Sequence, residues 1–358
     1  MEMHYYSETV IILTRLEVII MDLIKRYSSD KNIKASTMEG YTSAIKKYEK
    51  FHDKSIEELI AEAKKEEDLP LNKRKIKKQL TDFRKYLINS SLSNRSAKTY
   101  FSKIRAFYRY PDIEIPDIPN VKYTKNYQMN YEDLPSREHI KKAVEISEMG
   151  IQAMILFMAS SGTSKSETLS LKVNDFIKAT NSYHNDDSIA SVLDSLENKS
   201  IIPSFYLKRI KTDKYYYTFC TPEATSYIIK YLKSRPALKK SSKLFDYSSS
   251  AVTAKFREIN DSNGLGFRGR YRFFRPHALR KFHASNINLS AETVDELQGR
   301  GKSEVHDAYI KTKPEALKKS YKSKMCNVEI LKTEETLKDD EFNIYINVFV
   351  GDRTINIQ

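Results

Sequence analysis

Cysteine is scarce in this 358-residue chain, which contains only Cys220 and Cys326. Two cysteines cannot build a disulfide framework, so the sequence favours a reducing compartment and we expect a cytoplasmic protein. No stretch is long and apolar enough to span a bilayer. The nearest, VIILTRLEVIIMDLI at residues 10–24, is interrupted by three charged residues and is typical of an amphipathic helix. It also lacks the small-residue cleavage site of a signal peptide.

Several catalytic signatures are missing as well. The sequence has no Cys/His cluster, no HExxH, no dense carboxylate set with metal-ligand spacing and no GxxxxGK[ST] loop. We therefore expect no metal and no nucleotide cofactor. What the chain has is positive charge: 61 Lys and Arg stand against 47 Asp and Glu, a formal net charge of +14. Because a basic protein prefers a polyanion, nucleic acid is the leading partner, and no membrane is expected.

The first third of the chain is typical of a helical domain. Four helices are predicted between residues 36 and 110, and Ser55 is a plausible cap for the second. The fourth, NRSAKTYFSKIRAFYRY, has two distinct faces. Its apolar face is formed by Ala97, Phe101, Ile104 and Tyr108. Its polar face carries Arg95, Lys98, Arg105 and Arg109. The apolar face is expected to be buried, and the basic face is either solvated or lies along phosphates.

A proline-rich stretch, YPDIEIPDIPNVKY, then favours an extended linker. We expect a DNA-binding domain at residues 1–115, a linker at 116–132, a second globular domain at 133–325 and a tail at 326–358.

The second domain mixes helices with one hairpin. AMILFMASSG predicts a buried helix that ends near Gly162, and SKSETLSLKVNDF predicts one further helix. The β-rich runs IIPSFYLKRI and YYYTFC predict a hairpin around KTDK. Helices are expected from PEATSYIIKYLKSR to about residue 325. In the tail, TEETLKDDE is typical of a helix and NIYINVFV of a strand.

The densest basic stretch lies in this second domain. Residues 265–281 contain no acid and carry Arg268, Arg270, Arg272, Arg275, Arg280 and Lys281. Within this stretch, helical spacing puts His277 and Arg280 on one face. Arginine forks and imidazole N–H groups are suited to hold the charge that develops on a phosphodiester during cleavage. A lysine can protonate the leaving oxygen and a tyrosine can be the nucleophile, and that chemistry needs no metal.

These residues resemble the tyrosine recombinases, the phage-integrase family. The sequence HALR at 277–280 matches the family's H-x-L-R box. GRGKSEVHDAY resembles its G-H-x(8)-Y segment, with Arg300 where a histidine is usual and Tyr309 at the nucleophile. LKRIKTDKYYYTF resembles the catalytic β-hairpin, with Lys211 as its lysine.

A fourth segment, SSGTSKSETLSL, resembles the first arginine box of integrases from methanogenic archaea and their mobile elements. Glu167 and Leu169 fit this box, and Lys165 holds its arginine position. A lysine keeps the charge but cannot make a planar bidentate contact. The four segments occur in the order that the family has.

The resemblance implies a mainly α fold with a small antiparallel sheet, built as a helical core-binding domain and a catalytic domain. It implies a site-specific recombinase or integrase, acting without metal or ATP, that cleaves and rejoins DNA through a 3′-phosphotyrosyl link. The implied catalytic residues are Tyr309, Arg280, His277, Lys211, Lys165 and Arg300. The DNA-binding residues would be the basic face given above together with Arg268, Arg270, Arg272 and Arg275. The implied partner is double-stranded DNA at attachment-type sites, with a homotetramer on DNA and a monomer possible in solution.

Alternatives remain open at single positions. Tyr321 competes with Tyr309 as nucleophile, and Lys208 or Lys214 competes with Lys211. Lys165 is otherwise a plain surface lysine. His306 and Lys302 are candidates to replace the missing histidine. The alternative functions are a type IB topoisomerase-like enzyme or tyrosine transposase with the same chemistry, and a DNA-binding relative without catalysis.

Overall fold

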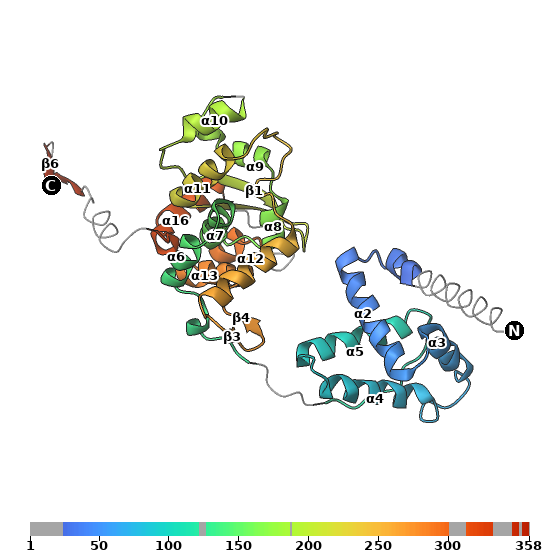
Figure 1. Ribbon diagram of the computed structural model, residues 1–358. Helices are drawn as coiled ribbons and strands as arrows, with labels where there is room; N and C mark the ends of the chain where they lie inside the picture. The colour runs from blue at the N-terminus through green and yellow to red at the C-terminus, as the bar shows by residue number, and fades with distance from the viewer. Residues whose placement is uncertain are drawn as a thin grey trace. The chain divides into compact units, whose positions relative to one another are not determined.

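The chain divides into two units between Tyr127 and Gln128 (Figure 1). The computed structural model describes residues 24–121, 127–186, 188–300, 313–331, 346–350 and 353–357. Each unit has its own cluster of buried apolar side chains, so each has a hydrophobic core of its own.

The first unit is a bundle of helices, as predicted. Its described helices include α2 (Ala35–His52), α3 (Ile56–Lys65), α4 (Lys75–Asn89) and α5 (Asn94–Tyr108). The hydroxyl of Ser55 accepts the Glu58 N–H, and the Glu58 carboxylate accepts the Ser55 N–H at 2.7 Å. This reciprocal cap confirms the predicted start of the second helix.

The two-faced helix α5 packs against α2 and α4 with its apolar face. Ala97, Phe101, Ile104 and Tyr108 are all buried, which confirms the predicted apolar face. Chain beyond α5 also belongs to this unit. Ile118 is buried in the same core, and Arg84 donates to the carbonyl of Pro119 at 2.7 Å. The beginning of the expected linker at 116–132 is therefore packed rather than extended between the units.

Helix α7 (Met149–Ser161) runs through the second unit and is buried along nearly its whole length. It packs against α6 (Arg137–Glu145), α11 (Pro222–Lys233) and α13 (Pro276–Asn286), which surround it in Figure 1. It ends at Gly162, which has a left-handed backbone with φ 65°, as the sequence predicts. A Cβ here would lie 2.6 Å from Nδ1 of His283, so glycine is required for both conformation and space. The other helices are α8 (Lys165–Ser170), α9 (Val173–Ala179), α10 (Ile189–Leu196), α12 (Ser249–Ser262), α14 (Ala291–Leu297) and α16 (Pro314–Lys322).

The predicted hairpin is present. Strands β1 (Ser204–Lys208) and β2 (Tyr215–Phe219) pair antiparallel, with Tyr206 opposite Tyr217. Phe205 and Leu207 face the core while Tyr206 and Lys208 are exposed, so alternate residues of β1 lie on opposite faces of the hairpin. The sheet contributes to the same core as α7.

Two expectations in this unit are wrong. The predicted single helix SKSETLSLKVNDF is two helices, α8 and α9, because the chain turns extended at Leu171 and Lys172 bridges to Lys243. The stretch expected to be helical as far as residue 325 contains a second hairpin, β3 (Phe267–Arg268) and β4 (Tyr271–Arg272). Strands of two residues are too short to show alternation in the sequence.

A third two-stranded antiparallel sheet lies in the tail, with β5 (Ile346–Val350) paired to β6 (Arg353–Ile357). The predicted strand NIYINVFV thus coincides in part with β5. The predicted helix TEETLKDDE and all but the last residue of the predicted helix at residues 10–24 lie outside the described residues. Within the described part of the chain, every helix is too short or too polar to cross a membrane.

Candidate functional site

Arg280 lies at the centre of a buried polar cluster. It is on α13, and its side chain is only 6% exposed. Its two terminal nitrogens each donate to a backbone carbonyl at 2.7 Å, Nη1 to Gly162 and Nη2 to Gln298. The carboxylate of Glu167 lies 3.5 Å from Nη1. The guanidinium is therefore fixed in position by the end of α7, by α8 and by the end of α14.

Glu167 is held as firmly as the arginine that it faces. Its Oε2 accepts the N–H of Ser164 at 2.9 Å, because Glu167 closes the capping box of α8. The same oxygen accepts the hydroxyl of Tyr216 at 3.1 Å. Burial, and then the Glu167 carboxylate, raise the pKa of Tyr216, which keeps its hydroxyl protonated as a donor. One buried carboxylate thus balances one of the positive charges in the HALR stretch.

His277 is exposed and lies about one helical turn before Arg280 on α13. Partial burial of its ring lowers its pKa, and so do Lys281, Arg275, Arg280 and Arg300, in that order. The imidazole is consequently neutral at neutral pH. The structure therefore brings together three of the predicted site residues, His277, Arg280 and Arg300. Arg300 also pairs with Asp295 at 3.2 Å.

Sequence reasoning missed the contribution of the β1–β2 hairpin to this cluster. Nη1 of Arg209 donates to the carbonyl of Gly299 at 2.6 Å. Gly299 has φ 59°, and a Cβ there would lie 2.4 Å from the Tyr216 ring. The hairpin thus holds the turn that leads into Arg300. The inward position of Tyr216 follows from strand alternation, but its partners are distant in the sequence and give no local signal.

Lys165 lies at the first turn of α8, as expected, but its ammonium points to another helix. Nζ donates to Thr253 Oγ1 at 2.8 Å and to the carbonyl of Ser249 at 3.2 Å, both on α12. Among the described residues, the structure joins Lys165 to α12 and not to the Arg280 cluster.

Lys211 lies in the turn between β1 and β2 and is exposed. The turn is closed by two backbone bonds between Arg209 and the residues that follow it, Asp213 and Lys214. Lys208, an alternative to Lys211, pairs with Asp213 at 3.1 Å. Lys211 is thus presented at the tip of the hairpin, while Lys208 already has a carboxylate partner.

Of the two candidate nucleophiles, Tyr309 and Tyr321, the structure describes only Tyr321. Tyr309, like His306 and Lys302, lies outside the described residues. Tyr321 is fully buried, and its hydroxyl donates to the carbonyl of Ser160 at 3.0 Å. Burial raises its pKa well above the usual range. A buried, hydrogen-bonded phenol cannot reach an external phosphate, so the geometry assigns Tyr321 to the core.

The predicted basic face of α5 is mostly exposed. Arg95, Lys98 and Arg109 are exposed, whereas Arg105 is half-buried beside the ring of Phe101. The Nε of Arg105 is buried and has no hydrogen-bond partner among the described residues. The exposed surface is therefore carried by Arg95, Lys98 and Arg109.

Of the four predicted arginines of the second unit, three belong to the β3–β4 hairpin and one follows it. Arg270 is exposed, between the two strands. Arg268 lies 3.4 Å from Asp133, and Arg272 makes two hydrogen bonds to Asp261. Arg275 precedes the first residue of α13 and donates to the carbonyl of Arg272.

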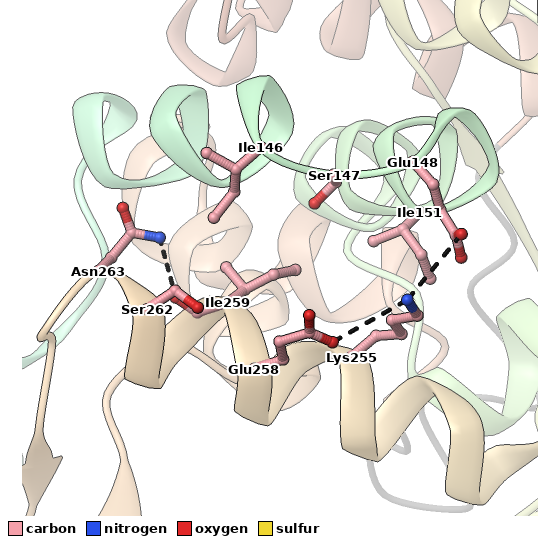
Figure 2. Close-up of a pocket in the computed structure, with 9 residues that line it drawn as sticks. All are labelled: Ile146, Ser147, Glu148, Ile151, Lys255, Glu258, Ile259, Ser262 and Asn263. Atoms are coloured by element: carbon pink, nitrogen blue, oxygen red, sulfur yellow. Dashed lines mark hydrogen bonds and ion pairs between the residues drawn. The ribbon is translucent and has the colours of Figure 1, made fainter.

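A cavity of about 280 Å³ lies between the start of α7 and α12 (Figure 2). Lys255 pairs there with Glu148 at 4.0 Å and with Glu258 at 3.9 Å, and Ile146, Ile151 and Ile259 supply apolar lining. None of the predicted site residues lines this cavity. The candidate site, the buried cluster around Arg280, therefore lies apart from this cavity.

Comparisons with known proteins find a family match for one segment and similar solved structures for most of the chain. Residues 19–111 match the phage integrase SAM-like domain family. The structure is similar to that of the XerH site-specific recombinase bound to difH substrate, with 16% identity, a TM-score of 0.50 and coverage of 84% of this chain and 83% of that one. It is also similar to a lambda integrase tetramer bound to a Holliday junction, with 15% identity, a TM-score of 0.52 and coverage of 82% and 76%.

No curated protein sequence matches the chain. At such low identity the structural similarity establishes the fold, which is mainly helical with small antiparallel sheets; the resemblance implied a mainly helical fold with one such sheet. Residues 19–111 thus match the phage integrase SAM-like domain family, and the chain shares its fold with the recombinase and integrase structures to which it is similar.

Proposed function

We propose that this protein is a site-specific DNA recombinase that cleaves and rejoins strands through a 3′-phosphotyrosyl intermediate. The observation that supports this most is the Arg280–Glu167–Tyr216 cluster with His277 about one helical turn before Arg280. An arginine fixed by two carbonyls and a carboxylate is a preorganised cation, beside a neutral imidazole that can donate a hydrogen bond. In a chain with the tyrosine recombinase fold, the anion that these residues are suited to bind is a scissile phosphate.

The proposed reaction balances without an external reagent. The phenol of Tyr309 gives its proton to water and attacks phosphorus, forming a P–O bond to tyrosine while the bond to the 5′-oxygen breaks. Lys211 donates a proton to that oxygen. Arg280, His277 and Arg300, with Lys165 as a further candidate, stabilise the charge on the non-bridging oxygens. The 5′-hydroxyl of another strand then gives its proton to the now neutral Lys211 and attacks phosphorus. The P–O bond to Tyr309 breaks, and the phenolate takes a proton from water.

The proposed partner is double-stranded DNA at attachment-type sites. The XerH structure holds its difH substrate, and the lambda integrase structure holds a Holliday junction in a tetramer. We propose the same kind of assembly here, with four protomers on two duplexes. A nicked suicide substrate tests the chemistry, because loss of the short 5′ fragment traps the covalent adduct on a denaturing gel. Strand exchange into a second duplex then separates recombination from simple resealing.

We expect the exposed face of α5 to contribute to DNA affinity through phosphates. Replacing Arg95 and Arg109 with glutamine should weaken binding and flatten the dependence of log K on log salt by about two units in slope, since each lost phosphate contact releases about one counterion fewer. Fluorescence anisotropy over a salt series measures the slope. The same charge change at Lys64 and Lys65 on α3 is the matched control. An unchanged slope in the Arg95 and Arg109 variant would show that this face is merely solvated.

Lys165 provides a second test of the proposed function. Lys165→Arg should cleave DNA at least as fast as the parent, because it retains the charge. Lys165→Ala should cleave much more slowly than both, because losing one preorganised donor costs about 10²–10³ in rate. Single-turnover cleavage of the suicide substrate at saturating protein removes differences in affinity. Thr253→Val takes away a partner of Lys165 on α12 but keeps the ammonium, and should preserve the rate. If Lys165→Ala matches the parent, Lys165 only joins α8 to α12.

A further inference from the structure

The β3–β4 hairpin exposes two aromatic rings. Phe267 is 55% exposed and Tyr271 is 63% exposed, although large aromatic side chains bury most favourably. Neither ring contributes to the core of the second unit. Two exposed aromatic side chains on one short element are a candidate for an interaction surface.

Each of these rings is covered on one side by a guanidinium. Arg272 lies over Phe267 and Arg275 over Tyr271, both at 5.1 Å from the ring centroid. This is within the range of a cation–π contact. With one face covered and more than half of the side chain exposed, each ring offers its other side to a partner.

The covering arginines are themselves fixed. The Nε and Nη2 of Arg272 donate to the two carboxylate oxygens of Asp261 at 2.9 and 3.0 Å. Arg275 donates to the carbonyl of Arg272. The rings are therefore held in orientation before any partner arrives, which lowers the entropy lost on binding. The exposed tyrosines of β1 and β2 differ, because Tyr206 stacks on Tyr215 and the rings cover each other.

The surroundings of the two rings are positively charged. Four arginines lie at positions 268, 270, 272 and 275, and two carboxylates lie beside them, with Asp133 next to Arg268 and Asp261 next to Arg272. A partner that fits must present flat apolar faces together with negative charge. Nucleotides have both, and base–aromatic stacking is indifferent to sequence because every base has a π face.

The hairpin is also close to the candidate site along the chain. Arg275, which covers Tyr271, directly precedes α13, and His277 is the second residue of that helix. We propose that Phe267 and Tyr271 form a stacking platform for unpaired bases of a DNA strand, next to the phosphate that His277 and Arg280 would hold. The location beside a scissile phosphate rests on the proposed function, whereas the binding of unpaired bases does not.

Unpaired bases fit the platform better than a paired duplex. In a duplex each base is already stacked on both faces, and inserting a ring costs a few kcal/mol per step. Bases in a bulge or an opened strand have free faces and pay no such cost. The affinity gained on two prepared rings is therefore specific to unpaired nucleotides.

The test compares two DNAs of equal length with the full-length protein. One is fully paired and the other has a short central run of unpaired thymidines, and anisotropy gives the ratio of their Kd values. The parent should prefer the second DNA. Phe267→Leu and Tyr271→Leu should each reduce that preference about fivefold to a hundredfold, the range found for loss of one stacked base. Tyr271→Phe keeps the ring and should keep the preference, as should Tyr131→Ala, which removes an exposed aromatic outside the hairpin.

Different results overturn different statements. A parent without preference, or leucine variants that retain it, overturns the platform. Leucine variants that change self-association in sedimentation but keep the preference assign the rings to a protein contact and also overturn it. The covalent adduct on the suicide substrate is measured in parallel. Adduct without preference overturns the platform alone, whereas preference without adduct supports the platform and overturns the proposed recombinase chemistry.

Discussion

Replacing Tyr309 with phenylalanine should abolish the covalent protein–DNA adduct and leave DNA affinity nearly unchanged. The substitution removes only a hydroxyl, so the contacts of the basic surfaces to phosphates are retained. Loss of a nucleophile costs on the order of 10⁶ in rate, which takes adduct formation below detection. The measurement is a denaturing gel of the suicide substrate after single-turnover incubation, with anisotropy on the same DNA as the measure of affinity.

Tyr321→Phe is the matched control for this experiment. Its hydroxyl is buried and donates to the carbonyl of Ser160, so its loss should lower stability by about 0.5–1.5 kcal/mol and leave adduct formation intact. Adduct from the Tyr309 variant, together with none from a folded Tyr321 variant, would reverse the assignment. It would also require α16 to leave the core, because Tyr321 packs against Phe219 there.

Local patterns predicted the elements that depend on local forces. The buried face of α5, the Ser55 cap, the end of α7 at Gly162 and the β1–β2 hairpin could all be derived from spacing and residue type. The break between α8 and α9 could not, because it depends on a bridge from Lys172 to Lys243. The β3–β4 hairpin could not either, since its strands are too short for a period.

The site divides in the same way. His277 and Arg280 are predicted to lie close together because they are about one helical turn apart. The position of Glu167 follows from the resemblance of SSGTSKSETLSL to the first arginine box. The parts contributed by Arg209, Tyr216 and Gln298 come from segments far apart in the sequence and needed the tertiary structure. The direction of the Lys165 side chain could not be predicted from the sequence either. Its charge suits a contact to phosphate, but its hydrogen bonds lead to α12.

Arg280→Met should be strongly destabilising for a reason separate from catalysis. The change leaves the Glu167 carboxylate, 4% exposed, without its cation, and two backbone carbonyls without their donor. Breaking a buried ion pair from one side costs about 3–5 kcal/mol. Adding Glu167→Gln removes the uncompensated charge while the amide can still accept the Tyr216 hydroxyl. The double variant should therefore recover part of the lost stability although both variants fail to cleave DNA.

Urea unfolding followed by circular dichroism, on the parent, both single variants and the double variant, gives the coupling energy between the two side chains. The expected cycle is strongly non-additive, with the double variant more stable than Arg280→Met alone. Additive losses would mean that Glu167 is balanced by other groups and that Arg280 is held by its carbonyl contacts.

Arg280→Lys separates charge from orientation. It keeps a positive charge near Glu167 and so most of the stability, but it loses the pair of hydrogen bonds to carbonyls that orient the guanidinium. If orientation matters for the phosphate, this variant should lose less stability than Arg280→Met, remain folded, and cleave about 10²–10³ more slowly than the parent.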